Sequence, residues 1–377
     1  MRRVALVSER RADYSRFKPV LLEIQKDPEL DYVLFVTGSH LLRKYGHTVD
    51  KIRADGFRIE AELPMYEEKY EDTGAEMARG LGRVLMRISE ELETTRPDIV
   101  LAGFDLGSNL AIAMAGAHMN IPVAHIQGGE VTGSIDECLR HATTRFAHVH
   151  LPSSDDAVER LIKMGENPEH VFKVGDPSLD LLLNAPAMPR EQVVREFDLD
   201  PSRPYAIAIQ HPVTTEVEDS GSQIRNTINA LGQTNLQALF IFPNTDAGNK
   251  RIIEEIQSRG GTWTTGLEPE VYANVLRHAA VLIGNSSSGI HEAASFRVPV
   301  VNIGTRQEGR LRPENVIDVG YSERDILEGT RKAISGSFRE KLTGNNPYGD
   351  GKAAPRIVGV LKTLKITREL LQKKLAY

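Results

Sequence analysis

Three consecutive serines in the second half of the chain stand where a diphosphate could bind. Residues 280–283 are apolar and predict a short buried strand, and a helix is expected to begin near Gly289. A helix start offers unpaired N–H groups and the positive end of a dipole, beside the hydroxyls of Ser286 and Ser287. Glu292 follows about one turn later, where a carboxylate can accept hydrogen bonds from a ribose diol. The plainer interpretation of this stretch alone is a serine-capped helix.

Strand-like and helix-like segments alternate along the whole chain. This alternation predicts right-handed βαβ units on parallel sheets, and the length predicts two Rossmann-like doubly wound domains. We expect an N-terminal domain over 1–174 and a C-terminal domain over 175–354. The tail is expected to be helical over 354–374, and the C-terminal segment 355–377 is expected to pack back on the first domain. Strands are expected at 4–7, 32–36, 58–63, 98–102, 121–126, 148–151, 205–209, 236–242, 280–283 and 298–303. Helices are expected at 17–25, after a polar loop at 8–14, and at 48–54, 76–95, 110–118, 191–197, 222–233, 250–259 and 268–279.

Most polar clusters of the sequence follow the ends of these strands. Ligands of open parallel sheets bind beyond the carboxyl ends of the strands, so two facing domains would bring these clusters together in one cleft. The first domain would supply Arg11, Asp13, Ser15, Asp105, Gln127 and Glu130. The second would supply His211, Asn244, Asp246, Ser286, Ser287, Glu292 and Arg306.

Composition excludes several classes of protein. The 377 residues are 40% hydrophobic and 26% charged, with a formal net charge of −6 and no basic run suited to nucleic acid. Cys138 is the single cysteine, and no long apolar segment occurs, so we expect a cytoplasmic protein that spans no membrane. Walker A, dinucleotide-binding and zinc motifs are absent from the sequence, which predicts no metal and no cofactor.

Eight motifs, in order along nearly the whole chain, resemble those of the hydrolysing UDP-N-acetylglucosamine 2-epimerases of sialic and legionaminic acid synthesis. The resemblance implies a glycosyltransferase-B architecture with UDP bound between the two domains. The motifs are Arg11-Ala12-Asp13-Tyr14-Ser15, Thr37-Gly38-Ser39-His40, the segment from Gly128 to Asp136, Arg140-His141, the segment from Gln210 to Thr215, the segment from Phe242 to Gly248, Gly284-Asn285-Ser286-Ser287, and Gly304-Thr305-Arg306-Gln307.

The resemblance also implies a reaction. Such enzymes expel UDP from C-1 while removing the proton at C-2, and water adds to the glycal to give a free 2-epimerised amino sugar. Candidates for the proton transfers are Asp105, Glu130, Asp136 and His211. Candidates for the diphosphate are Arg11, Ser286, Ser287 and the start at Gly289, with Glu292 on the ribose and Arg306 on the uracil side or supporting the diphosphate-binding residues. Asp13, Asp136 and Glu137 are equally well read as turn or helix-start carboxylates.

Two first-domain positions depart from the family pattern. Leu106 follows Asp105 where the family usually has arginine, and a second carboxylate is missing there. Gln127 stands where family members often have glutamate, and an amide cannot take or give a proton in that role.

These departures leave three functions open. The first is a hydrolysing 2-epimerase acting on UDP-N-acetylglucosamine or a diacetamido analogue, giving UDP and free N-acetylmannosamine or its analogue. The second is a non-hydrolysing epimerase or another UDP-sugar conversion, and the third is a UDP-sugar-binding protein without catalysis. A homodimer or homotetramer is expected from the resemblance, with the helix at 76–95 as a candidate seam.

Overall fold

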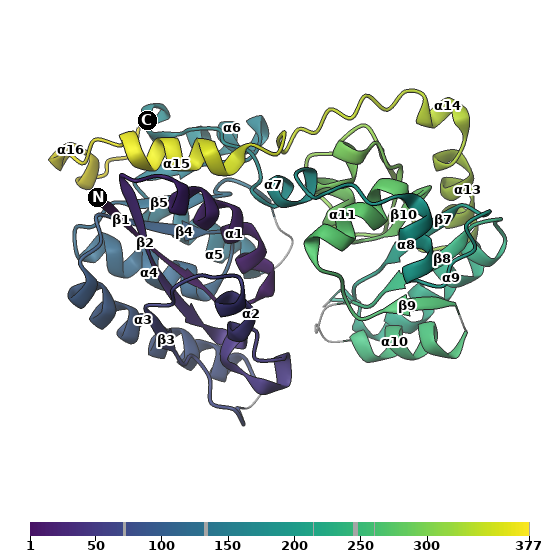
Figure 1. Ribbon diagram of the computed structural model, residues 1–377, viewed down its shortest axis with the longest axis horizontal. Coiled ribbons are helices and arrows are strands. Elements are labelled where there is room, and N and C mark those ends of the chain that lie inside the picture. Colours follow the sequence, from purple (N-terminus) through teal and green to yellow (C-terminus); the bar gives the residue numbers. More distant parts are fainter. Residues whose placement is uncertain (71–72, 132–134, 214, 244–247, 260, 377) are drawn as a thin grey trace. The chain divides into compact units, whose positions relative to one another are not determined.

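The chain forms two parallel sheets, each within its own compact unit (Figure 1). The computed structural model describes residues 1–377 except 71–72, 132–134, 214, 244–247, 260 and 377. Unit 1 comprises Met1–Asp180 and Gly351–Tyr377, and unit 2 comprises Leu181–Asp350. Helices flank each six-stranded sheet, so the prediction of two Rossmann-like doubly wound domains is confirmed.

The sheet of unit 1 has the order β3-β2-β1-β4-β5-β6. Apolar runs of short length, buried on both faces, are typical of such parallel strands, and every residue of β4 is buried. The strands are β1 (Arg2–Ser8), β2 (Leu30–Thr37), β3 (Ala61–Leu63), β4 (Ile99–Gly103), β5 (Val123–Ile126) and β6 (Val149–Leu151). The helices are α1 (Arg11–Lys26), α2 (Val49–Ala54), α3 (Gly74–Thr95), α4 (Gly107–His118), α5 (Ile135–Phe146), α6 (Asp155–Lys163), α15 (Ala353–Thr363) and α16 (Arg368–Leu371). The boundary between the units falls within a further helix, α7 (Ser178–Leu183).

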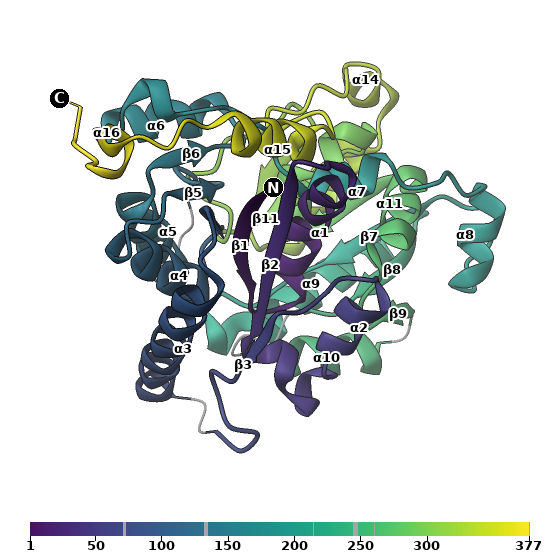
Figure 2. The same cartoon turned by 60° about the vertical axis from the view of Figure 1, so that its left-hand side comes forward.

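Two apolar cores cover the faces of this sheet. The helices α3 and α4 pack on one face and α1 and α15 on the other, as Figure 2 shows. Ile357 and Leu361 of α15 are fully buried in the second core, so the C-terminal tail is part of unit 1. The prediction of one continuous helix over the tail is wrong between residues 363 and 368. The helix α15 ends at Thr363, and Thr367 caps a separate helix α16 by accepting the N–H of Leu370.

The sheet of unit 2 has the order β12-β11-β10-β7-β8-β9. The edge strands β9 and β12 and the helix α13 were not predicted, because these segments are short or mostly polar. The strands are β7 (Tyr205–Ile209), β8 (Gln237–Ile241), β9 (Thr262–Thr264), β10 (Val281–Gly284), β11 (Val300–Ile303) and β12 (Val316–Val319). The helices are α8 (Arg190–Glu196), α9 (Ser220–Gly232), α10 (Asn249–Ser258), α11 (Pro269–His278), α12 (Ser288–His291), α13 (Glu323–Ala333) and α14 (Gly336–Arg339).

The first predicted loop is wrong in its second half. The helix α1 begins at Arg11, within the stretch 8–14 that was expected to be a polar loop. Asp13 makes this early start possible, because its carboxylate accepts the backbone N–H groups of Glu9 and Arg10. Within the described residues, no helix is both long and apolar enough to cross a membrane.

Candidate active site

Asp105 and Gln127 follow the carboxyl ends of neighbouring strands, and one buried arginine contacts both. Arg140 of α5 is 2% exposed. Its guanidinium donates to the carboxylate of Asp105 at 2.5 Å and to the backbone carbonyl of Gln127 at 3.0 Å. Arg140 was quoted among the family motifs without a role, and its helix α5 was not predicted. The structure shows that it joins the ends of β4 and β5.

The side chain of Gln127 is held from the opposite direction. Its Oε1 accepts a hydrogen bond from Arg16 at 3.3 Å, and an arginine can only donate, so this contact defines which end of the amide is oxygen. Its Nε2 is buried and has no hydrogen-bond partner among the described residues. Gln127 also has a left-handed backbone, with a φ of 58°. Such sparsely populated conformations concentrate at functional sites.

His125 supports the turn that precedes Asp105. One ring nitrogen lies 3.2 Å from the carbonyl of Phe104, a second left-handed residue with a φ of 68°, and the other lies 3.2 Å from the hydroxyl of Thr144. Burial lowers the pKa of His125 to about 3. A neutral imidazole therefore fixes the Phe104 turn, which directly precedes Asp105.

Glu130 lies beyond β5 with partners of its own. It is 6% exposed, and its carboxylate accepts a hydrogen bond from Ser153, which follows β6. Arg160 of α6 donates to the carbonyl of Gly129 at 2.6 Å and so fixes the preceding turn. Ser153 and Arg160 carried no motif that would have marked them. Asp136 lies in the first turn of α5, the helix that carries Arg140.

Arg11 and Ser15 lie at the start of α1. The Ser15 hydroxyl donates to the carbonyl of Ala12 at 2.8 Å, and the Arg11 residue is exposed. Asp13 is buried below them, and burial raises its pKa to about 7, although the N–H donors of Glu9 and Arg10 act in the opposite direction. These contacts make Asp13 a helix-start carboxylate that positions the Arg11 turn.

In unit 2, the backbone of His211 is clamped by Asn285. The His211 N–H donates to Asn285 Oδ1 at 2.7 Å, and Asn285 Nδ2 donates back to the His211 carbonyl at 2.8 Å. Strands β7 and β10 are neighbours, so the residues after them meet. Gly284 permits this approach because a Cβ there would lie 2.0 Å from the carbonyl oxygen of Ile209.

The residues after β11 join the same group. Arg306 and Gln307 both donate to the carbonyl of Asn285, at 3.1 Å and 2.8 Å. His211, the serine turn and Arg306 therefore lie at the carboxyl ends of three adjacent strands. Asn244 and Asp246 lie outside the described residues.

The helix expected to start near Gly289 is much shorter than a dipole argument needs. The helix α12 spans Ser288–His291 and is followed by a 3₁₀ turn over Ala293–Phe296. The N–H of Gly289 is already bonded to the carbonyl of Ser286 at 3.1 Å, and Arg297 ends the segment in a left-handed conformation with a φ of 55°. The expectation of a helix-dipole seat at Gly289 is therefore wrong, and hydroxyl and guanidinium groups remain as the anion-binding chemistry of this turn.

Glu292 directly follows α12 and is held by a residue of that helix. Its Oε2 accepts a hydrogen bond from Ser288 at 2.7 Å, and the Ser288 hydroxyl is in turn hydrogen-bonded to the hydroxyl of Tyr272 on α11. Neither Ser288 nor Tyr272 had been assigned a role.

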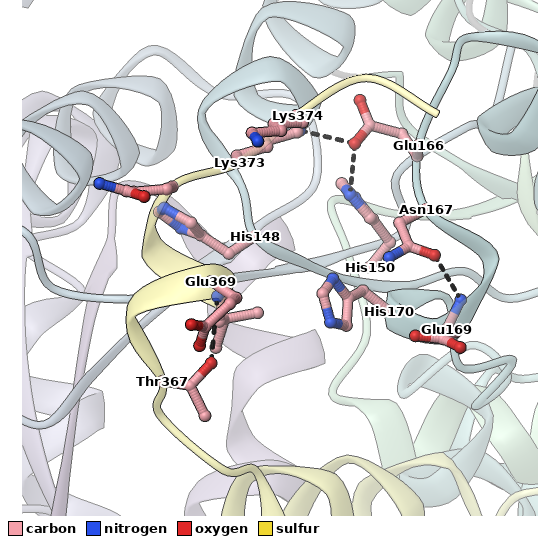
Figure 3. A pocket seen from close by; sticks show the side chains of 12 residues that line it. His148, His150, Glu166, Asn167, Glu169, His170, Thr367, Glu369, Lys373 and Lys374 are labelled. Carbon is pink, nitrogen blue, oxygen red and sulfur yellow. Dashed lines mark hydrogen bonds and ion pairs between the residues drawn. The ribbon is translucent and has the colours of Figure 1, made fainter. Parts of the chain in front are cut away.

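A cavity of about 340 Å³ lies elsewhere in unit 1, between β6 and the C-terminal segment (Figure 3). It contains none of the predicted site residues. His148 precedes β6, so the cavity adjoins the amino end of that strand, whereas Gln127 and Asp105 follow the carboxyl ends of theirs. The lining residues are His148, His150, Glu166, Asn167, Glu169, His170, Thr367, Glu369, Leu370, Gln372, Lys373 and Lys374.

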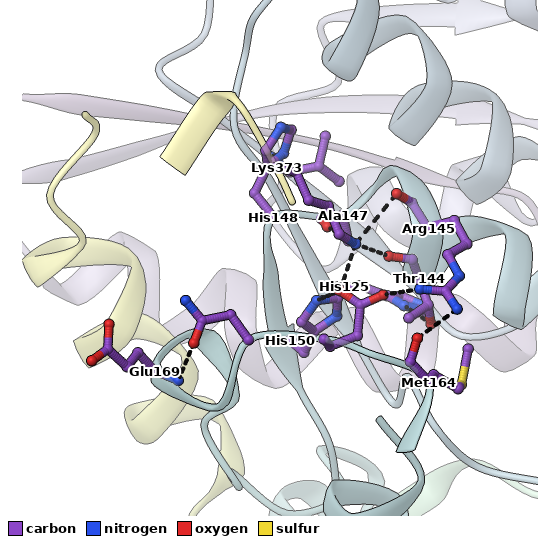
Figure 4. A network of polar contacts seen from close by, with 12 residues as sticks. His125, Thr144, Arg145, Ala147, His148, His150, Met164, Glu169 and Lys373 are labelled. Atoms are coloured by element: carbon purple, nitrogen blue, oxygen red, sulfur yellow. Dashed lines mark hydrogen bonds and ion pairs between the residues drawn. The ribbon is translucent and has the colours of Figure 1, made fainter. Parts of the chain in front are cut away.

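A buried polar network lies beside this cavity and connects β6, α5 and the C-terminal segment (Figure 4). Glu166 is 1% exposed and pairs with Arg145 at 3.0 Å, His150 at 2.8 Å and Lys373 at 2.6 Å. The ammonium of Lys373 also donates to the carbonyls of Thr144 and Ala147, at 2.9 Å and 2.7 Å, at the carboxyl end of α5. The network therefore links the C-terminal segment to the helix that carries Arg140.

Known proteins are similar to this chain in sequence. A relative from Legionella pneumophila, described as a hydrolysing UDP-N,N'-diacetylbacillosamine 2-epimerase, is 37% identical over the full length of both chains. A Neisseria meningitidis UDP-N-acetylglucosamine 2-epimerase is 32% identical, with 92% of this chain and 91% of the relative covered.

The fold has solved counterparts. The crystal structure of a Neisseria meningitidis UDP-GlcNAc 2-epimerase bound to UDP-GlcNAc superposes with a TM-score of 0.81, 20% identity, and coverage of 95% of this chain and 99% of that one. This likeness supports the glycosyltransferase-B architecture. The family model described as UDP-N-acetylglucosamine 2-epimerase matches residues 22–362. With nearly the whole chain matched, this protein belongs to the UDP-N-acetylglucosamine 2-epimerase family of enzymes.

Proposed function

We propose that this enzyme is a hydrolysing 2-epimerase of a UDP-linked 2-acetamido sugar. One observation carries the proposal: the full-length match at 37% identity to a relative that is described as hydrolysing. The products would be UDP and the free 2-epimerised amino sugar. The diacetamido substrate in that relative's name makes a UDP-diacetamido hexose the first substrate to test, with UDP-N-acetylglucosamine second.

In this proposal the proton transfers belong to Asp105, Glu130, Asp136 and His211. Asp105 is the candidate to accept the C-2 proton, and the buried Arg140 guanidinium at 2.5 Å holds its carboxylate in position at the end of β4. Gln127 cannot exchange a proton, so its role is to contribute hydrogen bonds beside Asp105.

The nucleotide half of the proposal rests on unit 2. Ser286, Ser287 and Arg306 would bind the diphosphate together with Arg11, and Glu292 would accept hydrogen bonds from the ribose. In unit 1, the amino end of α4 is occupied by the protein's own carboxylate, since Glu9 accepts the N–H of Ser108 at 2.9 Å. A helix end already neutralised in this way is a poor seat for a diphosphate, which favours unit 2. Asn244 and Asp246 remain candidates for this half from the sequence.

The remaining parts of the proposal concern the setting. We place the enzyme in the cytoplasm, a reducing compartment that suits its single cysteine, working as a homodimer or homotetramer without metal or cofactor. The exposed methionines of α3, Met77 and Met86, mark that helix as the candidate seam.

The deciding experiment is incubation with each UDP-sugar, followed by quantification of UDP, free sugar and unreacted substrate. Equal amounts of UDP and free 2-epimerised sugar support the proposal. Interconversion of UDP-sugars without UDP release would instead identify a non-hydrolysing epimerase, an alternative kept open by Gln127 replacing a family glutamate. Asp105→Asn is the control for these assays and should release no UDP, because the amide keeps the size of the side chain but removes the proton acceptor.

A further inference from the structure

Tyr272 lies behind the residue proposed to hold the ribose. It is part of α11, and its ring packs beside Leu182, Ala185 and Ala273. Its hydroxyl is hydrogen-bonded to the hydroxyl of Ser288, whose oxygen lies 2.7 Å from Glu292 Oε2. The side chains of Tyr272 on α11, Ser288 on α12 and Glu292 just after α12 therefore form one continuous series of hydrogen bonds.

The number of hydroxyl hydrogens determines which group donates in each of these hydrogen bonds. Ser288 has a single hydroxyl hydrogen, and the carboxylate of Glu292 can only accept. The Ser288 hydrogen is thus committed to Glu292, and Ser288 must accept the hydrogen of Tyr272. Burial, followed by the charge of Glu292, raises the pKa of Tyr272 well above its usual range, so this donor remains protonated under all physiological conditions.

We propose that Tyr272 is a positioning residue for nucleotide binding, acting through Ser288 to fix the carboxylate of Glu292 toward the ribose diol. Donors lined up on a carboxylate polarise one another and restrict its rotamer. Pre-ordering Glu292 in this way removes part of the entropy cost of binding. The inference rests on the proposed role of Glu292, and it predicts an effect on binding of the nucleotide and not on the chemical step.

Tyr272→Phe is the central variant, because it removes one hydroxyl and keeps the ring in the core. We expect the Kd for UDP and the KM for the UDP-sugar to rise by about 2- to 12-fold, the effect of one hydrogen bond, with kcat within about twofold of the parent. Ser288→Ala breaks the same series of hydrogen bonds at its centre and is expected to give a similar change. It also serves as the test if Tyr272→Phe does not fold.

The matched control is Tyr205→Phe. Tyr205 is another buried tyrosine of unit 2, and its hydroxyl donates to the backbone carbonyl of Val275 at 2.6 Å. Its loss is expected to lower the Tm without changing the Kd for UDP. If Tyr205→Phe weakened UDP binding as much as Tyr272→Phe, the effect would be one of general stability and the inference would be overturned.

Glu292→Gln separates this inference from the proposed function. If Glu292 binds the ribose, this variant binds UDP more weakly, and adding Tyr272→Phe to it weakens binding little further. Loss of binding in Glu292→Gln with a parental Kd in Tyr272→Phe and in Ser288→Ala would overturn the positioning role alone. A parental Kd in Glu292→Gln would overturn the ribose assignment itself.

Discussion

The guanidinium of Arg140 lies 2.5 Å from the carboxylate of Asp105, and the arginine side chain is 2% exposed. Taking both charges out of water is costly, and their attraction offsets that cost only while both partners are present. The same guanidinium supports the carbonyl of Gln127, so this one arginine positions two strand ends at once.

Replacing Arg140 by methionine should therefore remove activity and much of the stability of unit 1. Loss of one partner of a buried pair costs about 3–5 kcal/mol, because the remaining charge is left uncompensated. Urea unfolding and UDP-release assays measure the two effects. Arg324→Met is the control, since Arg324 pairs with Glu328 at an exposed site of α13 and should change neither quantity. Parental activity in Arg140→Met would show that Asp105 does not need this partner.

Gln127→Glu should be tolerated by the fold. The new carboxylate would keep the acceptor that receives the Arg16 hydrogen bond, and it would remove the Nε2 donor that has no partner among the described residues. Pairing with Arg16 and the loss of the unpartnered donor offset the cost of burying a charge, so we expect a Tm close to that of the parent. We expect a UDP-release rate at least several-fold above the parent if a proton-exchanging group is limiting at this position. Gln127→Met, which loses the acceptor, serves as the comparison. A fall in rate in Gln127→Glu would instead mean that the amide itself is part of the mechanism.

The ends of the parallel strands were predictable because apolar runs of four to six residues are followed by polar turns. Asp105, Gln127, Glu130, His211 and the serine turn were placed in this way, and the strand order then explains why those of one unit lie together. Their partners were not predictable. Arg140, Arg16 and Asn285 act through contacts between residues distant in sequence, which periodicity does not report.

The errors have local causes. The start of α1 was missed because a buried carboxylate, Asp13, satisfies its first N–H groups. The helix near Gly289 offers no dipole seat because the serine side chains and carbonyls bond to the backbone within their own turn, as Ser286 does with the N–H of Ser288 at 3.3 Å.

Acidification should destabilise the fold through three buried histidines. Burial lowers the pKa of His125 to about 3 and those of His40 and His148 to about 4, from the ordinary 6.5. The unfolded chain then binds protons first as the pH falls below 6.5, so the free energy of unfolding decreases between about pH 6.5 and pH 4. Lowering the pKa from 6.5 to about 4 corresponds to about 3 kcal/mol for His40 and for His148, and lowering it to about 3 corresponds to about 5 kcal/mol for His125.

Asp13 acts in the opposite direction. Its folded pKa of about 7 exceeds the ordinary 3.8, so its protonation favours the folded state as the pH falls. Three histidines outweigh one aspartate, and the net slope should remain destabilising. Urea unfolding at pH 7.5, 6, 5 and 4 measures it. His148→Gln should flatten the profile, and a flat profile in the parent would contradict the burial of these rings.

Lys373 should be necessary for the C-terminal segment to stay in place, whereas its neighbour Lys374 should not. The Lys373 ammonium pairs with buried Glu166 at 2.6 Å and donates to three carbonyls at the end of α5, where positive charge is also favoured by the helix dipole. Lys373→Met leaves Glu166 with Arg145 as its one lysine or arginine partner among the described residues, beside the ring of His150, and we expect a loss of about 2–4 kcal/mol in the free energy of unfolding. Lys374→Met carries the same change of charge and volume one residue further along, so any effect of net charge or segment hydrophobicity appears in both variants.

Hydrogen exchange at α5 and α16 locates the loss: faster exchange at the end of α5 in Lys373→Met alone supports the link. Equal exchange in both variants would show that the segment is held by its apolar contacts.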